Sequence, residues 1–453
     1  MGAIRRQCLI TLGHSLLGSF PCVHYGLLSP IESHIRRFIV QAHSLHGSLT
    51  QASFYWALVA SSHYWSPLIS FLPSIIAYER LGRRPTLFHI CSAFIIAGST
   101  MAFLSVDAGS RVLRILIIGR ALVGMALVAG FYRSNFLLEC FCGSEIAASL
   151  SIMPILGHAL FTALGALIGS PSLLGGDSNW QYSFLVTIPA SLAYMGMGML
   201  LPESPRHLYL TQRDRAAAKR AAEFYTAGTA DWDALEEEYE RELLMTSSDV
   251  PLRLVSLWRL RHYRMPILLS LIMNSFVAFN NGNVADTYAV EILYANGTGG
   301  LNREQAALIN GVVLQGVSIV TTVVAALVVG WFKRRTLLFF GMVVGLAGTG
   351  LMAVRYFQLE SYSESLTSQL GILWQMLGSS SVVFLYPPVV ELWGAGAFHL
   401  AMTIVCLICL LWLCPTLPET KGKSLEEVMS IWIDSNDQVA ENQPLLGDNL
   451  SMV

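Results

Sequence analysis

Two long hydrophobic halves, joined by one densely charged stretch at residues 202–264, constrain the fold of this chain more than any other feature. Each half contains apolar runs that are long enough to cross a bilayer as helices. Hydrophobic residues make up 54% of the 453-residue sequence and charged residues only 13%, which is typical of membrane proteins. Since charges are costly in hydrocarbon, we expect the middle stretch to lie outside the bilayer. The sequence therefore predicts an all-α, polytopic membrane protein.

The charged stretch opens with two prolines, Pro202 and Pro205, directly after an apolar run. Proline stops a preceding helix because it lacks the backbone N–H and clashes with the previous turn. Residues 211–244 then combine helix-forming residues with mixed charge, which is the composition of solvated helices. We therefore expect a helical linker on the cytoplasmic side.

Charge and cysteine usage exclude several functional classes. The formal net charge is −2, so no basic excess is available for binding nucleic acid. Most of the eight cysteines lie inside apolar runs, where they act as small hydrophobic residues, and their spacing indicates neither a metal site nor a disulfide framework. We expect no cofactor, no metal and no enzymatic activity.

The first half contains six apolar runs, at residues 8–28, 54–77, 86–106, 115–138, 146–169 and 182–201. Arg5 and Arg6 precede the first run, and no small-residue cleavage site follows it, so we expect a retained signal anchor with a cytoplasmic N-terminus. Residues 29–53 should then form an external loop. Six spans return the chain to the cytoplasm, where the charged linker begins.

The second half contains five apolar runs, at residues 266–294, 305–331, 337–356, 370–390 and 395–413. The chain therefore has 11–12 predicted transmembrane helices. We divide it into an N-terminal six-helix bundle, a cytoplasmic linker, a shortened C-terminal bundle and a tail, at residues 1–201, 202–264, 265–414 and 415–453.

Short turns rich in arginine follow the second run of each half, at residues 80–84 and 333–335. Lys and Arg accumulate in short cytoplasmic loops. Carboxylates at neighbouring helix ends, Glu79, Glu139 and Glu203, can pair with these arginines and hold the helix ends together, each pair contributing about 1 kcal/mol when solvated. The alternative is that the arginines only mark the cytoplasmic side.

The turn at residues 80–84, together with Gly119-Arg120 and the segments 202–206 and 418–422, resembles the signature set of the sugar-porter branch of the major facilitator superfamily. The spacing is most similar to that of the facilitative glucose transporters. The resemblance covers nearly the whole chain in order, and the two pentapeptides at the ends of the two halves are its most specific part. It implies two six-helix bundles and alternating access to a central site.

The resemblance also implies a set of gating residues at the cytoplasmic helix ends. They are Glu79, Arg80, Arg83, Arg84, Arg120, Glu139, Glu203, Arg206, Arg334, Arg335 and Glu419. The family's tenth helix, with its terminal acid, has no counterpart between the ninth run and the tenth. We interpret the chain as a shortened transporter, an incomplete or spliced form, or one whose late helices have changed orientation.

A neutral sugar requires hydrogen-bonding groups and an aromatic surface along a water-filled path. The seventh run supplies them best, and by resemblance Asn283 matches the family's sugar-binding asparagine, whereas two family glutamines fall on Val277 and Ala278. The candidate substrate-binding residues are Asn283, Asn280, Asn281, Gln315, Asn310 and His24. A polar residue on a membrane helix is also commonly an interhelical hydrogen-bond partner.

Two further motifs concern processing and sorting. Asn296 begins an Asn-X-Thr sequon, and Glu441, Leu445 and Leu446 resemble an acidic dileucine signal for a sorting adaptor. A second sequon begins at Asn449, so the side on which the tail lies decides which motif is available. We expect a cytoplasmic tail and a plasma-membrane location, with an endosomal or lysosomal membrane as the alternative.

The sequence therefore predicts a carrier for a hexose or a related polyol, working by facilitated diffusion within a lipid bilayer. Two alternatives stay open. One is a transport-inactive relative with a binding or regulatory role, favoured by the missing tenth helix and the lost glutamines. The other is a proton-coupled or organic-ion carrier, which His24 and Asp286 permit.

Overall fold

The protein is described here from a computed structural model, which covers residues 2–42, 49–127, 130–141 and 153–246 continuously. It also covers residue 150, residues 315–328, 339–347 and 395–416, and isolated positions between 268 and 336. Within these residues the regular elements are helices, with no strand among them. The all-α prediction is therefore confirmed.

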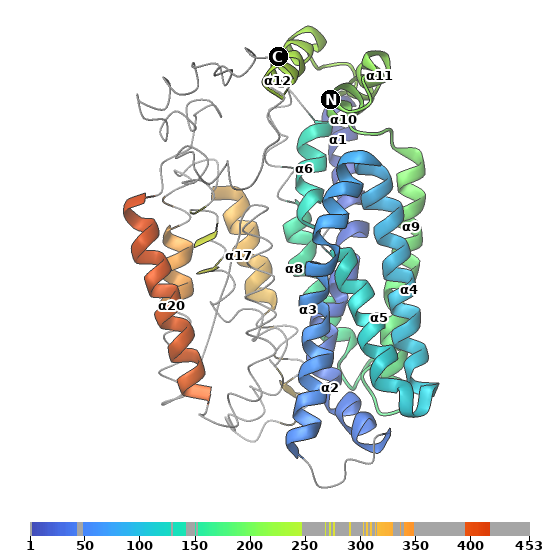
Figure 1. Ribbon diagram of the computed structural model, residues 1–453, viewed down its shortest axis with the longest axis vertical. Helices are drawn as coiled ribbons and strands as arrows, with labels where there is room; N and C mark the ends of the chain where they lie inside the picture. The colour runs from blue at the N-terminus through green and yellow to red at the C-terminus, as the bar shows by residue number, and fades with distance from the viewer. Residues whose placement is uncertain are drawn as a thin grey trace, which may run out of the picture.

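The first half of the chain forms a bundle of long, roughly aligned helices (Figure 1). Their bounds are α1 Gly2–Ser19, η1 Phe20–Cys22, α2 Val23–Ala42, α3 Leu49–Arg80, η2 Pro85–Ile90, α4 Cys91–Leu104, η3 Ser105–Arg111, α5 Val112–Leu127, α6 Gly130–Cys140, α8 Met153–Ile168, η4 Trp180–Val186 and α9 Thr187–Leu200. Among the described residues, three segments are long and apolar enough to cross a membrane: Pro85–Gly109, Val112–Cys140 and Trp180–Leu200. Met153–Ile168 and Ala401–Leu413 are shorter apolar helices.

The predicted external loop at residues 29–53 is wrong over most of its length. Helix α2 continues through Pro30 to Ala42, and α3 already begins at Leu49. The extension buries Ile31, Ile35 and Ile39 at helical spacing against the hydrophobic core around Trp56. This apolar face, four residues apart at each step, stabilises a helix where the polar His and Ser residues indicated a loop.

The helices of the bundle pack closely where glycine allows it. A Cβ on Gly26 of α2 would lie only 1.9 Å from the carbonyl oxygen of Thr162 on α8. Small residues permit this kind of backbone approach between membrane helices. The packing of α2 on α8 fixes the face of α2 that carries the neighbouring Tyr25.

The described part of the linker, residues 202–246, contains three short helices at one end of the bundle (Figure 1). They are α10 Pro205–Leu210, α11 Arg215–Thr226 and α12 Trp232–Thr246. Side chains of Ser204 and Asp214 accept hydrogen bonds from the backbone N–H of His207 and Ala217, and so cap α10 and α11. The described part of the linker is helical, with a break at Ala227, which takes a left-handed conformation.

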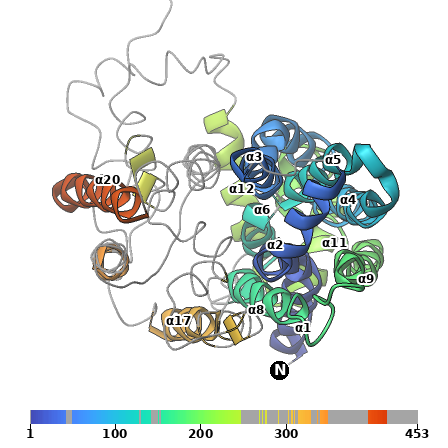
Figure 2. The ribbon, with the colours of Figure 1, turned by 90° about the horizontal axis from the view of Figure 1, so that it is seen from below.

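In the second half the described helices include α17 Gln315–Val328 and α20 Ala395–Thr416. Helix α17 packs beside α8 of the first bundle, as the view from below shows (Figure 2). Phe276, Met342, Cys406, Cys409 and Leu413 form a buried apolar cluster. The missing tenth helix and most of the predicted spans of the second half concern residues outside the described ones.

Candidate functional site

The charged loop between α3 and η2 meets the start of the linker through Glu203. The Glu203 carboxylate accepts hydrogen bonds from the backbone N–H groups of Arg83, at 3.1 Å, and Arg84, at 3.1 and 3.2 Å. Gly82 makes this approach possible, since its φ is +109° and a Cβ there would lie 2.2 Å from Glu203 Oε2. The loop conformation and the carboxylate position therefore depend on each other.

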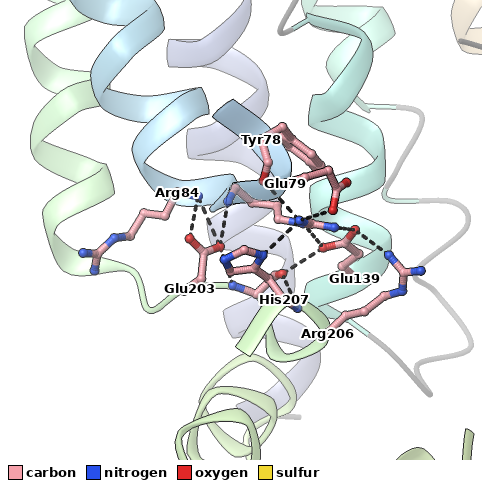
Figure 3. Close-up of polar contacts among 9 residues, drawn as sticks. Tyr78, Glu79, Arg84, Glu139, Glu203, Arg206 and His207 are labelled. Carbon is pink, nitrogen blue, oxygen red and sulfur yellow. Dashed lines mark hydrogen bonds and ion pairs between the residues drawn. The ribbon is translucent and has the colours of Figure 1, made fainter. Parts of the chain in front are cut away.

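Arg83 joins this loop to the end of α6, where Glu139 is labelled in Figure 3. Its Nε donates to Glu139 Oε2 at 2.9 Å and its Nη2 to Glu139 Oε1 at 3.2 Å, which is a bidentate pair. The Arg83 side chain is 2% exposed and the Glu139 side chain 12% exposed. Because both are withdrawn from water, each charge-assisted hydrogen bond contributes about 1.5–3 kcal/mol rather than the small value of a surface pair.

Glu139 also binds the beginning of α10. Ser204 Oγ donates to Glu139 Oε2 at 2.8 Å, and Arg206 Nη1 lies 3.5 Å from Glu139 Oε1. One carboxylate thus connects the α3–η2 loop and the linker. We call the set Tyr78, Glu79, Arg83, Arg84, Glu139, Glu203, Ser204, Arg206 and His207 the Arg83 latch.

The remaining donor group of Arg83, Nη1, faces three acceptors. These are Tyr78 O at 3.1 Å, Glu79 Oε2 at 3.2 Å and His207 Nδ1 at 3.0 Å. The guanidinium carbon lies 4.5 Å from the centroid of the Tyr78 ring, close enough for a cation–π contact. Hydrogen bonds therefore hold the edge of the guanidinium, and the Tyr78 ring contacts its face.

Burial and hydrogen bonding shift the pKa values of the charged latch residues in opposite directions. Burial alone would lower the pKa of Arg83, but the hydrogen bonds and charge of Glu139 raise it overall, so Arg83 stays cationic. Burial raises the pKa of Glu203 above its usual value, although the backbone N–H groups of Ser204 and Arg84 oppose the shift. A shallow cleft of about 260 Å³, lined by Tyr78, Glu79, Arg83, Asn135, Leu138, Glu139 and Arg206, lies beside the latch.

A second polar cluster lies inside the bundle, on the side of α2 and α8. Tyr25 of α2 contacts the His63 ring of α3 edge-on at a centroid distance of 4.5 Å, the Tyr64 ring at 5.7 Å and the His158 ring of α8 at 5.4 Å. Arg120 of α5 lies close to Tyr25 and Tyr64. Its Nε donates to Val59 O at 3.0 Å, whereas its Nη1 is buried without a partner among the described residues.

This central cluster combines aromatic faces with hydrogen-bonding groups. Tyr25 is half-buried and His158 is exposed, whereas His63, Tyr64 and Arg120 are buried. Because α8 also packs against α17, the cluster lies on the side of the bundle that faces the second half. Its composition, rings and donors together, is that of a site for a polyhydroxylated ligand.

The structure brings some of the predicted site residues together and places others apart. Glu79, Arg83, Arg84, Glu139, Glu203 and Arg206 come together in the latch. Arg80 is exposed at the end of α3, and Arg120 lies in the central cluster rather than at the helix ends. His24 is buried, with Nε2 3.1 Å from Ser99 Oγ and 3.2 Å from Thr187 Oγ1, so it connects α2 to α4 and α9.

Gln315 is the first residue of α17. The other predicted residues lie outside the described residues: Asn280, Asn281, Asn283, Asn296, Asn310, Arg334, Arg335, Glu419, Glu441, Leu445 and Leu446.

Sequence reasoning missed the aromatic and histidine members of both clusters. The sequence pointed to His24, whereas the cluster contains the next residue, Tyr25. Consecutive residues of a helix lie on different faces, so a shift of one residue changes the side of α2 on which a side chain lies. His207 follows the pentapeptide 202–206 and lies three residues after the capping Ser204. Its titratable side chain directly after Arg206 was the available signal.

Comparison with known proteins identifies the family and the fold. The Sugar (and other) transporter family model matches residues 11–373. Facilitated glucose transporter member 5 of solute carrier family 2, from Equus caballus, is 24% identical over 452 residues, covering 89% of this chain and 85% of the relative. Member 9 of Mus musculus is 27% identical over 302 residues, covering 66% of this chain and 53% of the relative. This chain thus spans about half the length of the mouse protein.

Solved structures share the fold. The proton:xylose symporter XylE from E. coli, bound to 6-bromo-6-deoxy-D-glucose, superposes with a TM-score of 0.73 at 18% identity, covering 94% of this chain and 100% of the symporter. A partially occluded inward-open form of XylE gives a TM-score of 0.71 at 16% identity, covering 92% of this chain and 99% of that structure. This chain therefore has the fold of a major facilitator and, because the family model covers most of its length, belongs to the sugar (and other) transporter family of multi-pass membrane proteins.

Proposed function

We propose that this protein carries a hexose or a related polyol across a membrane by facilitated diffusion with alternating access. The central cluster carries the proposal. Tyr25, Tyr64 and the histidine rings offer flat apolar surfaces for a sugar ring, and the phenol, imidazole and unpartnered Arg120 Nη1 groups offer hydrogen bonds to hydroxyls. No covalent step and no cofactor is required.

In this proposal the second bundle supplies the opposite wall of the site through Asn283, with Asn280, Asn281, Asn310 and Gln315 as further candidates. His24 is a less direct participant, because its imidazole already binds Ser99 and Thr187. The Arg83 latch holds the linker against the cytoplasmic end of the first bundle, so that its release accompanies the change between the two access states.

We also propose the plasma membrane as the site of action, with a cytoplasmic tail. Asn296 would then be external during synthesis and accept a glycan, whereas Asn449 would remain bare. Glu441, Leu445 and Leu446 would be available to a cytoplasmic sorting adaptor, and an endosomal or lysosomal membrane would be the destination that such sorting favours. Endoglycosidase treatment of Asn296→Gln and Asn449→Gln variants tests this arrangement, and a glycan lost only with Asn449→Gln contradicts it.

Counterflow of labelled D-glucose into proteoliposomes of the purified protein tests the carrier proposal. We expect saturable exchange without an imposed pH gradient, and an Asn283→Ala variant with affinity reduced about 10- to 100-fold, the cost of one lost hydrogen bond to a desolvated hydroxyl. Retained binding of D-glucose without flux would favour a binding protein instead. Accumulation only under a pH gradient would favour proton coupling.

A further inference from the structure

His207 belongs to the Arg83 latch, but holding the linker on the bundle does not require a titratable side chain at this position. It lies in α10, is fully buried, and places Nδ1 3.0 Å from Arg83 Nη1. A guanidinium only donates hydrogen bonds, because all its lone pairs are delocalised. His207 Nδ1 must therefore accept, which places the single ring hydrogen of a neutral imidazole on Nε2.

The other ring nitrogen, Nε2, lies near Gly82 and the Glu203 carboxylate, since a Cβ on Gly82 would be 3.2 Å from His207 Nε2 and 2.2 Å from Glu203 Oε2. His207 Nε2 is buried and has no hydrogen-bond partner among the described residues. A second ring proton would be added to Nδ1, where it would point at the Arg83 guanidinium and remove the acceptor for Arg83 Nη1.

The charges around His207 are mixed, and the nearest one is a cation. Arg83 makes the direct contact, while the Glu79 and Glu139 carboxylates bind the same guanidinium from α3 and α6. The other charged groups of the site are Arg84, Glu203 and Arg206. Protonation of His207 would put two cations in contact in a buried place, which the more distant carboxylates, already engaged by Arg83, offset only in part.

We propose that His207 makes the Arg83 latch sensitive to cytoplasmic pH, because a proton on its imidazole repels Arg83 and releases α10 from the end of the bundle. This sensor is separate from the transported substrate. It would link carrier opening to acidification of the compartment that contains the linker.

The direction of the effect follows from the pKa of His207. Burial first, and then the charge of Arg83, lower the pKa of His207 in the latched form, whereas the released form regains the usual pKa of about 6.5. Protons therefore bind more tightly to the released form, and acidification favours release. Between pH 7.5 and pH 6.0 the equilibrium can shift by at most about fourfold for one such group.

Glu203 acts in the opposite direction at lower pH. Since burial raises its pKa in the latched form, its protonation favours the latched form. Glu203 therefore opposes the effect of His207, and a His207→Gln variant, which keeps Glu203, separates the two contributions.

The test measures the distance between the loop and the linker without any transport. Spin labels at Leu81→Cys and Lys219→Cys, both at exposed positions, report the separation in nanodiscs by pulsed electron paramagnetic resonance. Cys8, Cys140 and Cys142 are replaced by serine to prevent background labelling. We expect the population with the longer distance to rise about threefold to fourfold from pH 7.5 to pH 6.0.

Matched variants separate the sensor from other titrating groups. His207→Gln keeps an acceptor for Arg83 and cannot be protonated, so its population with the longer distance should not rise on acidification. His89→Gln, at a half-buried histidine in η2, should keep the response of the unmodified protein. If His207→Gln does not fold, His207→Phe, which also cannot be protonated, takes its place.

An unchanged pH response in His207→Gln or His207→Phe would overturn the proposal, as would a flat response of the unmodified protein. The result does not depend on the substrate, so failure of the carrier proposal in the D-glucose counterflow assay would leave this test intact.

Discussion

Arg83 and Glu139 form a bidentate ion pair, with Nε–Oε2 and Nη2–Oε1 distances of 2.9 and 3.2 Å, between the loop after α3 and the end of α6. Glu139 uses the same carboxylate to bind Ser204 and Arg206 at the beginning of the linker. The linker is thus attached to the bundle through a carboxylate that lies within the bundle. Loss of this one pair should loosen both connections at once.

Gly82→Ala should destabilise the protein because two separate costs coincide at this position. The φ of +109° disfavours a side chain, and the new Cβ would lie 2.2 Å from Glu203 Oε2. Gly109→Ala is the matched control, since Gly109 also has a positive φ, +54°, but nothing lies within 4 Å of its Cβ position. We expect a clearly larger loss of melting temperature for Gly82→Ala, measured by thermal unfolding in detergent. Equal losses would mean that Glu203 does not constrain the loop.

Gly26→Ala should separate α2 from α8. A Cβ at this position would lie 1.9 Å from Thr162 O, a backbone atom that cannot turn away. Gly196→Ala in α9 has open space and should be neutral or gain up to about 1 kcal/mol from better helix propensity. The folded fraction after detergent extraction, measured by size-exclusion chromatography, should fall only for Gly26→Ala. A well-folded Gly26→Ala protein would contradict the close packing.

Tyr25→Phe tests the central cluster as part of the sugar site. The change keeps the ring that contacts His63, Tyr64 and His158 but removes the hydroxyl. If the hydroxyl binds substrate, the KM for D-glucose should rise about 10- to 100-fold. Tyr182→Phe, at an exposed tyrosine in η4, serves as the control and should leave the KM unchanged. The same KM in both variants would remove Tyr25 from the site.

The sequence predicted the helical class, the linker and the charged partners of the latch because each depends on local composition. Arginines in a short loop cannot enter hydrocarbon, and carboxylates at adjacent helix ends are their natural partners. Tyr25 and Arg120 were placed less well, since the face on which a residue lies depends on packing between distant helices. The same dependence on packing applies to Ile31, Ile35 and Ile39. Their apolar face stabilises a helix because it is buried in the cluster that contains Trp56, a residue of another helix.

The central claim, that the Arg83–Glu139 pair holds the linker on the bundle, is tested most directly at Cys140. This thiol follows Glu139, is fully buried, and lies against Tyr225 of α11. In a variant that retains Cys140 as its only cysteine, labelling by a membrane-impermeant maleimide at pH 7.5 in inside-out vesicles reports release of the linker.

Glu139→Gln should weaken the latch by about 1.5–3 kcal/mol and therefore raise the rate of Cys140 labelling about 10- to 100-fold. The control is Glu237→Gln, at an exposed pair with Arg241 in α12, which should leave the labelling rate unchanged. A labelling rate for Glu139→Gln equal to that of the control would contradict the account and would reduce the arginines of this loop to markers of the cytoplasmic side.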